Sequence, residues 1–306
     1  MARKSISPIN FIHSIFINGL DGRFIYYPSK QNPKNNILIV YDIDSNIEKW
    51  WGLVISLSRF GNVTMMDLPG MGGMDSFYRI KKLPTIDNYG NYLAAFIKLR
   101  FRRKRLHLIG IGYGVSIITS MLNQNDDLVR KFISINSING YTHRDDFVMT
   151  KFNKFTTLIN YYLFALLPFS SLIKPFTLTN SYLREKYVLG ISAKNVKEFG
   201  IEFLEKFIYD LEKETDLRTR FYIYKDLLKL DLCKKQFNIP FKQINIGINN
   251  SKLANKFVEQ HFRIIYRNYS YLPSKLVRKI PLVLNDPKIA LKMLPNKLRK
   301  DLKLRS

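Results

Sequence analysis

The segment LHLIGIGYGVSIITSML, residues 106–122, joins three local patterns in a short stretch of chain. It opens with the apolar run LHLI, which is typical of a strand buried on both faces of a parallel sheet. Three glycines follow at alternate positions, Gly110, Gly112 and Gly114, and residues 115–123 have the apolar content of a packed helix. The segment therefore predicts a strand, a sharp glycine-rich turn and a helix.

Strand and helix patterns alternate on both sides of this segment. Apolar runs predict strands at residues 37–41, 62–67 and 132–136, and the periodicity of residues 47–59 and 85–99 predicts helices. Consecutive β-α-β units form a parallel sheet with right-handed connections, whose functional groups gather at the carboxyl ends of the strands. We therefore expect a doubly wound α/β sheet.

The regions that flank this alternation have different patterns. Residues 11–17 and 23–27 are rich in β-branched and aromatic residues and are separated by turn signals, which predicts an antiparallel hairpin. Residues 142–235 have only helical patterns, and strands are expected again at 243–247 and 262–266. The helical stretch is therefore predicted to be an insertion into the sheet.

In their order and spacing, these features resemble the α/β-hydrolase superfamily. Residues 110–114, GIGYG, match the nucleophile elbow G-x-S-x-G, and residues 67–73, DLPGMGG, resemble the D-x-P-G-x-G loop of esterases and epoxide hydrolases. The resemblance spans about residues 35–285. The cap segment from YVLG, residues 187–190, through LRTR, residues 217–220, is also faintly similar to maspardin-like proteins, which implies partner binding.

The resemblance implies an α/β-hydrolase fold with a mostly parallel sheet, an N-terminal antiparallel hairpin and a helical cap. We expect the core to comprise residues 1–141 and 236–286, and the cap to comprise residues 142–235. Residues 287–306 are expected to form a basic C-terminal helix or tail.

The residues that carry hydrolase chemistry are missing from the expected positions. Gly112 stands where the elbow presents its nucleophile, and the resemblance places Asn250 at the position of the acid and Tyr271 at that of the base. Asp42 stands near the oxyanion site, where a carboxylate would oppose developing negative charge. Glycine also relieves the backbone strain of an elbow, about 1–3 kcal/mol for a residue with a Cβ.

These departures predict a pseudo-hydrolase, a protein that keeps the fold without the Ser-His-Asp triad and binds a small apolar ligand or a protein partner. Because Asp42 is acidic, a ligand with a cationic or hydrogen-bonding group is favoured. The alternative is an esterase-like hydrolase that acts through other residues, such as a water activated by Asp42 or His143. The predicted ligand-binding residues are Asp42, Trp50, Gly112, Tyr113, Asn250 and Tyr271.

His143 is the histidine best placed for a displaced catalytic centre. With Asp145 or Asp146 it would form an acid–base pair beyond the end of a strand, although a polar loop that leads into the insertion explains the same residues. His107 is predicted to be packed inside a strand. His261 precedes the strand expected at residues 262–266, and we expect it at the opposite end of the sheet.

Other chemistries fit the sequence poorly. Val115 occupies the sixth position from Gly110, where a dinucleotide-binding G-x-G-x-x-G motif needs glycine. No G-K-[ST] motif follows a strand, and four scattered histidines show no metal-ligand spacing. Cys233 is the only cysteine, which excludes an internal disulfide, and a packed thiol is expected there. We therefore predict neither a metal nor a cofactor.

The chain is strongly basic, with 49 Lys and Arg against 24 Asp and Glu and a formal charge of +25. Because the basic residues are spread along the chain, compositional drift explains them best, and nucleic-acid binding is disfavoured. Weak association with an anionic membrane surface is the alternative, through residues 98–105 or 288–305. Residues 156–173 are uncharged but interrupted by polar residues, which favours a buried or membrane-touching helix. A cytoplasmic location is expected, with peripheral attachment to the inner membrane surface as the alternative.

Overall fold

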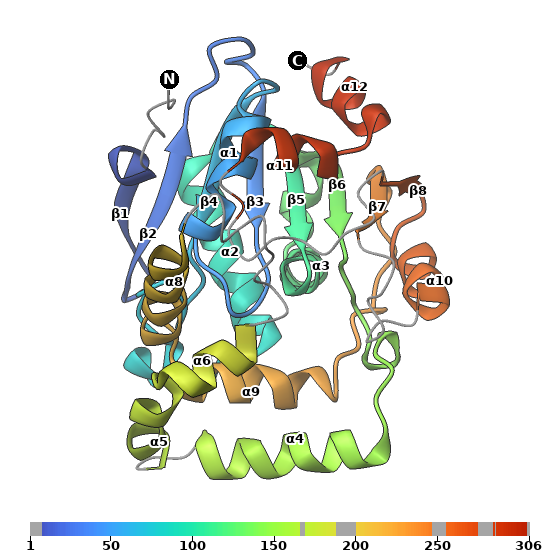
Figure 1. Ribbon diagram of the computed structural model, residues 1–306. Helices are drawn as coiled ribbons and strands as arrows, with labels where there is room; N and C mark the ends of the chain where they lie inside the picture. The colour runs from blue at the N-terminus through green and yellow to red at the C-terminus, as the bar shows by residue number, and fades with distance from the viewer. Residues whose placement is uncertain are drawn as a thin grey trace.

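The computed structural model describes residues 8–165, 169–187, 200–246, 255–274, 284 and 286–304. Its strands form one eight-stranded sheet in the order β1-β2-β4-β3-β5-β6-β7-β8 (Figure 1). The β1–β2 and β2–β4 pairs are antiparallel, and all other neighbouring pairs are parallel. The strands are β1 (Ile12–Ile17), β2 (Leu20–Tyr27), β3 (Asn36–Val40), β4 (Asn62–Met66), β5 (Leu106–Ile111), β6 (Phe132–Ile138), β7 (Phe241–Asn245) and β8 (Tyr269–Pro273).

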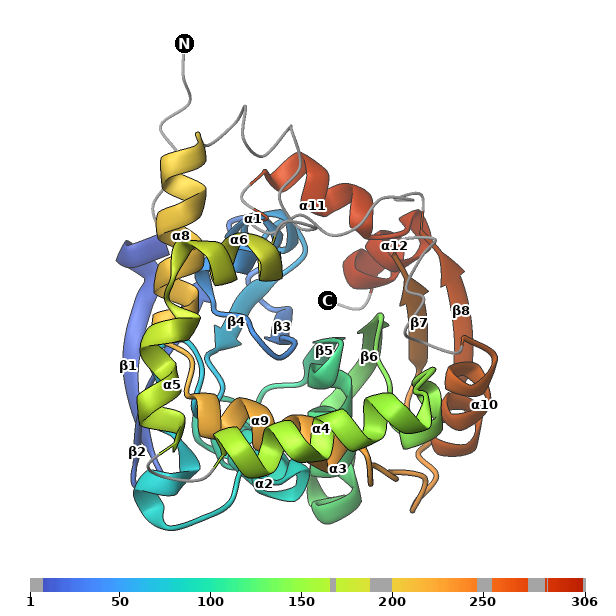
Figure 2. The same cartoon turned by 60° about the horizontal axis from the view of Figure 1, so that its bottom comes forward.

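The predicted hairpin and parallel sheet are confirmed. The central strands could be predicted because they are buried on both faces. Every residue of β3, β4 and β5 is buried, as expected for continuous apolar runs covered by helices on both faces. Helices α1 (Trp51–Leu57) and α11 (Pro287–Met293) lie on one side of the sheet. On the other side lie α2 (Ile86–Arg100) and α3 (Tyr113–Gln124) (Figures 1 and 2). The 3₁₀ helices are η1 (Pro8–Phe11), η2 (Glu48–Trp50), η3 (Phe77–Ile80), η4 (Asp126–Lys131) and η5 (Arg144–Asp146).

A helical insertion lies between β6 and β7, within the range expected from the sequence. Its helices lie beyond the carboxyl ends of the parallel strands (Figure 1). Thr150 and Asp216 cap two of them, because each side chain accepts a hydrogen bond from a backbone N–H in the first turn. The described helices of the insertion are α4 (Lys151–Phe164), α5 (Phe169–Thr177), α6 (Asn180–Tyr187), α8 (Ile201–Lys213) and α9 (Leu217–Leu227).

The strand expected at residues 262–266 is wrong, because this segment belongs to helix α10 (Asn255–Ile265). The β-branched and aromatic residues of FRIIY indicated a strand. However, Val258, Phe262 and Ile265 are buried and lie four and three residues apart, which is the spacing of one helix face. The last strand of the sheet is instead β8.

The C-terminal segment is helical and packs on the core, so of the expected helix or tail the structure has helices over residues 287–293 and 296–304. Met293, Leu298 and Leu302 have no exposed surface, and they join the main hydrophobic core. The Asn35 side-chain amide donates a hydrogen bond of 2.9 Å to the Leu302 carbonyl near the end of α12 (Asn296–Leu304). The apolar face of this segment is therefore already covered.

Candidate active site

The glycine-rich turn between β5 and α3 has a backbone that favours glycine. Gly112 has φ +52° and ψ −119°, a region that strains residues with a Cβ. At Gly114 the reason is close packing, since a Cβ there would lie 2.1 Å from the Val40 carbonyl oxygen. The turn therefore brings the start of α3 directly against the end of β3.

The sheet register places Asp42 beside this turn. Val40 of β3 pairs with Gly110 of β5 in the parallel ladder, and Asp42 and Gly112 each follow two residues later. A Cβ built on Gly112 would lie 2.2 Å from Cγ and Oδ2 of Asp42. The Asp42 carboxylate therefore occupies the space that any side chain at position 112 would need.

The same carboxylate takes up the hydrogen-bond donors of the turn. The backbone N–H of Tyr113, at the start of α3, donates to Asp42 Oδ1 over 2.8 Å, and the backbone N–H of Ile43 donates to the same oxygen over 2.9 Å. Burial raises the pKa of Asp42, and these two hydrogen bonds oppose that shift. Two N–H groups that converge on one oxygen at a helix N-terminus are the arrangement that stabilises an oxyanion.

The loop that carries Asp42 is anchored to the core through Asp67, the first residue of the DLPGMGG motif. Asp67 is fully buried and accepts hydrogen bonds from the Tyr41 hydroxyl and from the backbone N–H of Ile47, the latter over 3.0 Å. The Arg23 guanidinium donates to its other oxygen over 2.6 Å. Asp67 therefore holds both ends of the loop, residues 41 and 47, on the sheet.

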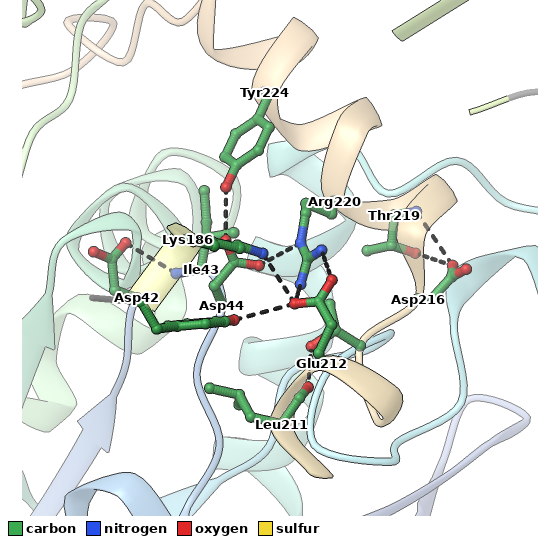
Figure 3. A network of polar contacts seen from close by, with 12 residues as sticks. Asp42, Ile43, Asp44, Lys186, Leu211, Glu212, Asp216, Thr219, Arg220 and Tyr224 are labelled. Atoms are coloured by element: carbon green, nitrogen blue, oxygen red, sulfur yellow. Dashed lines mark hydrogen bonds and ion pairs between the residues drawn. The ribbon is translucent and has the colours of Figure 1, made fainter. Parts of the chain in front are cut away.

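The helical insertion holds the same loop from the opposite side through Asp44. The guanidinium of Arg220, on α9, lies between the carboxylates of Asp44 and Glu212 and donates to both (Figure 3). Tyr224 donates its hydroxyl proton to Asp44 over 2.7 Å, and Lys186 lies 2.9 Å from Glu212. These five residues form a polar cluster, called here the Arg220 cluster, that fastens the insertion to the loop.

Electrostatics keep the acids of the Arg220 cluster ionised. Burial alone would raise the pKa of Asp44, but the positive charges of Arg220 and Lys186 outweigh it and hold the pKa well below its ordinary value. The pKa of Glu212 is lowered in the same way against its burial, chiefly by Arg220. Both carboxylates therefore contribute to stability only while they remain charged.

Solved structures with the same architecture are numerous, although no protein-family model and no curated protein sequence matches the chain. A membrane phospholipase A superposes with a TM-score of 0.67 at 12% identity, covering 96% of this chain and 86% of its own. An esterase from Thermogutta terrifontis gives 0.63 at 10% identity, covering 95% and 98%. An enol-lactonase from Burkholderia xenovorans gives 0.62 at 12% identity, covering 95% and 99%. The chain has the α/β-hydrolase fold.

In the α/β-hydrolase fold the turn after β5 is the nucleophile elbow, and the first N–H of the following helix belongs to the oxyanion hole. Gly112 occupies the elbow in this chain, as the sequence predicted. The sequence also predicted that Asp42 would lie near the oxyanion site. It did not predict that the carboxylate of Asp42 fills both the hole and the space above the elbow. The pairing of Val40 with Gly110 is the signal that could have revealed this placement.

Several of the other predicted site residues do not lie at the turn between β5 and α3. Trp50 and Tyr113 are buried in the main core, where the Trp50 indole N–H donates to Ser45 and the Tyr113 ring packs on Tyr89. Tyr271, at 48% exposure, lies on the edge strand β8. Asn250 lies outside the described residues. Among the predicted ligand-binding residues that the structure describes, Asp42, Gly112 and the backbone of Tyr113 therefore meet at this turn, whereas the Tyr113 ring points into the core.

His143 and His261 lie side by side, which corrects the expectation that His261 sits at the far end of the sheet. Their ring centroids are 4.3 Å apart, and His261 Nδ1 lies 2.6 Å from Asp146 Oδ1. Asp146 is fully buried, and its other oxygen accepts hydrogen bonds from the backbone N–H groups of Thr142 and His143. The pair was missed because residues 262–266, directly after His261, were expected to form a strand, whereas residues 255–265 form helix α10. This cluster fixes the chain where it enters the insertion.

The side-chain amide of Asn139 joins the end of β6 to the end of β7. The Asn139 side chain donates to the Ile246 carbonyl over 3.0 Å and accepts from the Ile246 N–H over 2.7 Å. The sequence after β8, residues 274–306, contains no histidine. Among the described residues, no group of three or more His, Cys, Asp or Glu is placed to hold a metal ion.

Proposed function

We propose that this protein is a pseudo-hydrolase, which has lost the catalytic triad of its fold and uses the former catalytic centre to bind a ligand. The observation that carries the proposal is the position of Asp42. Its carboxylate fills the space above Gly112 and accepts both N–H donors of the turn. A substrate carbonyl then has neither a nucleophile at the elbow nor free donors to polarise it.

The charge of Asp42 determines the ligand chemistry that we propose. The residue is only partly covered by protein, and its Oδ2 atom does not receive the N–H bonds that hold Oδ1. The Tyr141 hydroxyl and the Lys49 ammonium group already interact with this carboxylate, and the proposed ligand adds a further cationic or hydrogen-bond-donating group to them. The ligand is therefore a small molecule with an apolar body and a cationic or donor head, held beneath the helical insertion acting as a cap.

Calorimetry with hexylammonium and hexanoate, which share an alkyl chain, tests the ligand class. We expect hexylammonium to bind more tightly than hexanoate, and the difference to fall about tenfold or more in Asp42→Asn, because a charge-assisted hydrogen bond is lost. Asp126→Asn, which neutralises an exposed carboxylate paired with Lys235, is the matched control. Equal binding of both probes, or no effect of Asp42→Asn, contradicts this ligand class.

A fluorophosphonate probe and p-nitrophenyl butyrate test the loss of catalysis. We expect no labelling of the wild-type protein and no turnover above the background rate. Labelling that disappears in a variant of another serine, or steady turnover that survives extensive purification, would refute the pseudo-hydrolase proposal.

A second candidate function is hydrolysis with Asp42 as the nucleophile. One oxygen of its carboxylate is fixed by two N–H groups. The other would attack a carbon of an epoxide, whose C–O bond breaks as the new C–O bond forms and whose oxygen leaves as a hydroxyl after taking a proton from water. Water would then add to the carbonyl carbon of the resulting Asp42 ester and release the diol and the carboxylate. Turnover in water labelled with ¹⁸O distinguishes the candidates, because cleavage of such an ester places ¹⁸O in Asp42. An unlabelled Asp42 peptide after many turnovers excludes this route.

A further inference from the structure

Helices α4 and α5 form an outer layer of the insertion with an unusual distribution of apolar residues. The inner face of α4 packs on α9, where Tyr161 lies 5.8 Å from Tyr222 and Phe164 lies 5.0 Å from Phe221 between ring centroids. The outer face is nevertheless also apolar. Its exposed residues are Phe152, Phe155, Leu158, Ile159, Tyr162 and Leu163.

Helix α5 continues this surface. Phe169, Leu172 and Phe176 are at least half exposed and recur at the spacing of one helix face, while Ser170 and Thr177 on the other side are buried. Helix α5 follows α4 and packs on it beyond the carboxyl ends of the parallel strands (Figure 1). Together the exposed residues of α4 and α5 form what we call the apolar face. Large apolar side chains that gather in exposed positions on two neighbouring helices indicate an interaction site.

The charged residues within α4 and α5 have one sign. Between Asp146 and Arg184 the sequence contains three lysines and no acidic residue. The ammonium group of Lys174 is used internally, since it donates to the carbonyl oxygens of Glu212 and Thr215. Lys151 and Lys154 are exposed at the first turn of α4. A positive charge at the margin of an apolar surface complements anionic lipid headgroups.

The geometry of the two helices favours a position in the plane of a membrane over a crossing. No single helix among the described residues is long and apolar enough to span a bilayer. Taken together, α4 and α5 reach the required length and composition, but they are bent by 108° relative to each other. The inner face of α4 moreover packs against α9. Only the outer face is free to enter the lipid.

We propose that the apolar face docks on an anionic bilayer, with its aromatic and aliphatic side chains in the headgroup region and Lys151 and Lys154 facing the lipid phosphates. This surface differs from residues 98–105 and 288–305, which the charge pattern had indicated. It is also separate from Asp42, so it does not depend on the proposed ligand.

Co-sedimentation with vesicles tests the docking, using phosphatidylcholine with about 30% phosphatidylserine. We expect the wild-type protein to bind, and Phe155→Glu to bind about tenfold or more weakly, because burial of one aromatic side chain is lost. Phe16→Glu is the matched control, since Phe16 is 65% exposed and Phe155 is 61% exposed, but Phe16 lies on β1. We expect its binding to match the wild type.

Two further measurements complete the test. Lys151→Glu/Lys154→Glu should weaken binding to the anionic vesicles, with little change on pure phosphatidylcholine. Thermal unfolding of each variant establishes that the fold is retained. The proposal would be overturned if the folded wild-type protein did not bind the vesicles, or if Phe155→Glu and Phe16→Glu weakened binding equally. It would also be overturned if the protein bound no vesicles and formed a dimer in sedimentation velocity that Phe155→Glu dissociates. The last result would assign the face to a second copy of the chain.

Discussion

Restoring a serine at the elbow is expected to destabilise the protein instead of activating it. In Gly112→Ser, the new Cβ would lie 2.2 Å from the Asp42 carboxylate in a backbone region with φ +52°. Backbone strain contributes about 1–3 kcal/mol, and forcing the carboxylate away contributes about 1–3 kcal/mol through overpacking. Displacement of Asp42 also weakens its two N–H bonds. We therefore expect a loss of about 3–6 kcal/mol in the free energy of unfolding.

The Asp42→Ala background separates the clash from the strain. This change removes Cγ and both carboxylate oxygens, so that Gly112→Ser should then cost only the strain, about 1–3 kcal/mol. The two substitutions should thus be coupled by about 2 kcal/mol or more, in the direction that makes the double variant more stable than the sum of the single variants. Urea unfolding followed by the fluorescence of the buried Trp50 and Trp51 measures all four proteins. Additive effects, equal within about 0.5 kcal/mol, would show that Asp42 does not occupy the elbow.

Three further predictions concern the polar clusters that hold the insertion. Arg220→Ala should lower the free energy of unfolding by about 3–5 kcal/mol in urea unfolding, because it leaves Asp44 and Glu212 buried without their main counter-charge. Because the pKa of Asp44 is low in the folded protein, its charge stabilises the fold above about pH 4, and this stabilisation is lost as the pH falls further. The melting temperature of the wild type should therefore fall more steeply between about pH 5 and pH 3 than that of Asp44→Asn. Parallel curves of melting temperature against pH would contradict this. Asp146→Ala should cost about 2–4 kcal/mol in the same urea assay, because two backbone N–H groups and His261 lose their acceptor; a loss below about 0.5 kcal/mol, the level of a neutral surface change, would refute that role.

Much of the fold was predictable because strands buried on both faces consist of continuous apolar runs, which can be recognised in the sequence. Strands β3 and β5 are buried on both faces, and ILIV and LHLI are correspondingly apolar. The hairpin was predictable from its turn residues. Helix α10 was missed because FRIIY has strand-like composition, and the helical spacing became evident only from which side chains the structure buries.

The candidate site was predictable only in part, because its key contact depends on registration between strands that are distant in sequence. The sequence identified Gly112 as an elbow without a nucleophile and placed Asp42 near the oxyanion site. That Asp42 reaches over the elbow follows from the alignment of Val40 with Gly110. Asp42 also belongs to a loop that turns sharply after β3, where Asp44 adopts a left-handed backbone conformation with φ +57°. The Arg220 cluster was not predictable, since folding brings its members together from the loop after β3 and from α6, α8 and α9.

Under the proposed pseudo-hydrolase function, the residues at the elbow and the oxyanion site are better understood as one linked change than as independent losses. The N–H groups of Tyr113 and Ile43 need an acceptor whether or not the protein is catalytic, and in the apo state of a hydrolase water can supply it. Here Asp42 supplies it, and a carboxylate at the N-terminus of α3 is favoured by the helix dipole. That arrangement requires a glycine at position 112, because a Cβ and the carboxylate cannot share the same space. Without a hydroxyl at the elbow, a histidine after β8 would have no proton to accept. The absence of a histidine from residues 274–306 is therefore expected once Asp42 has taken this position.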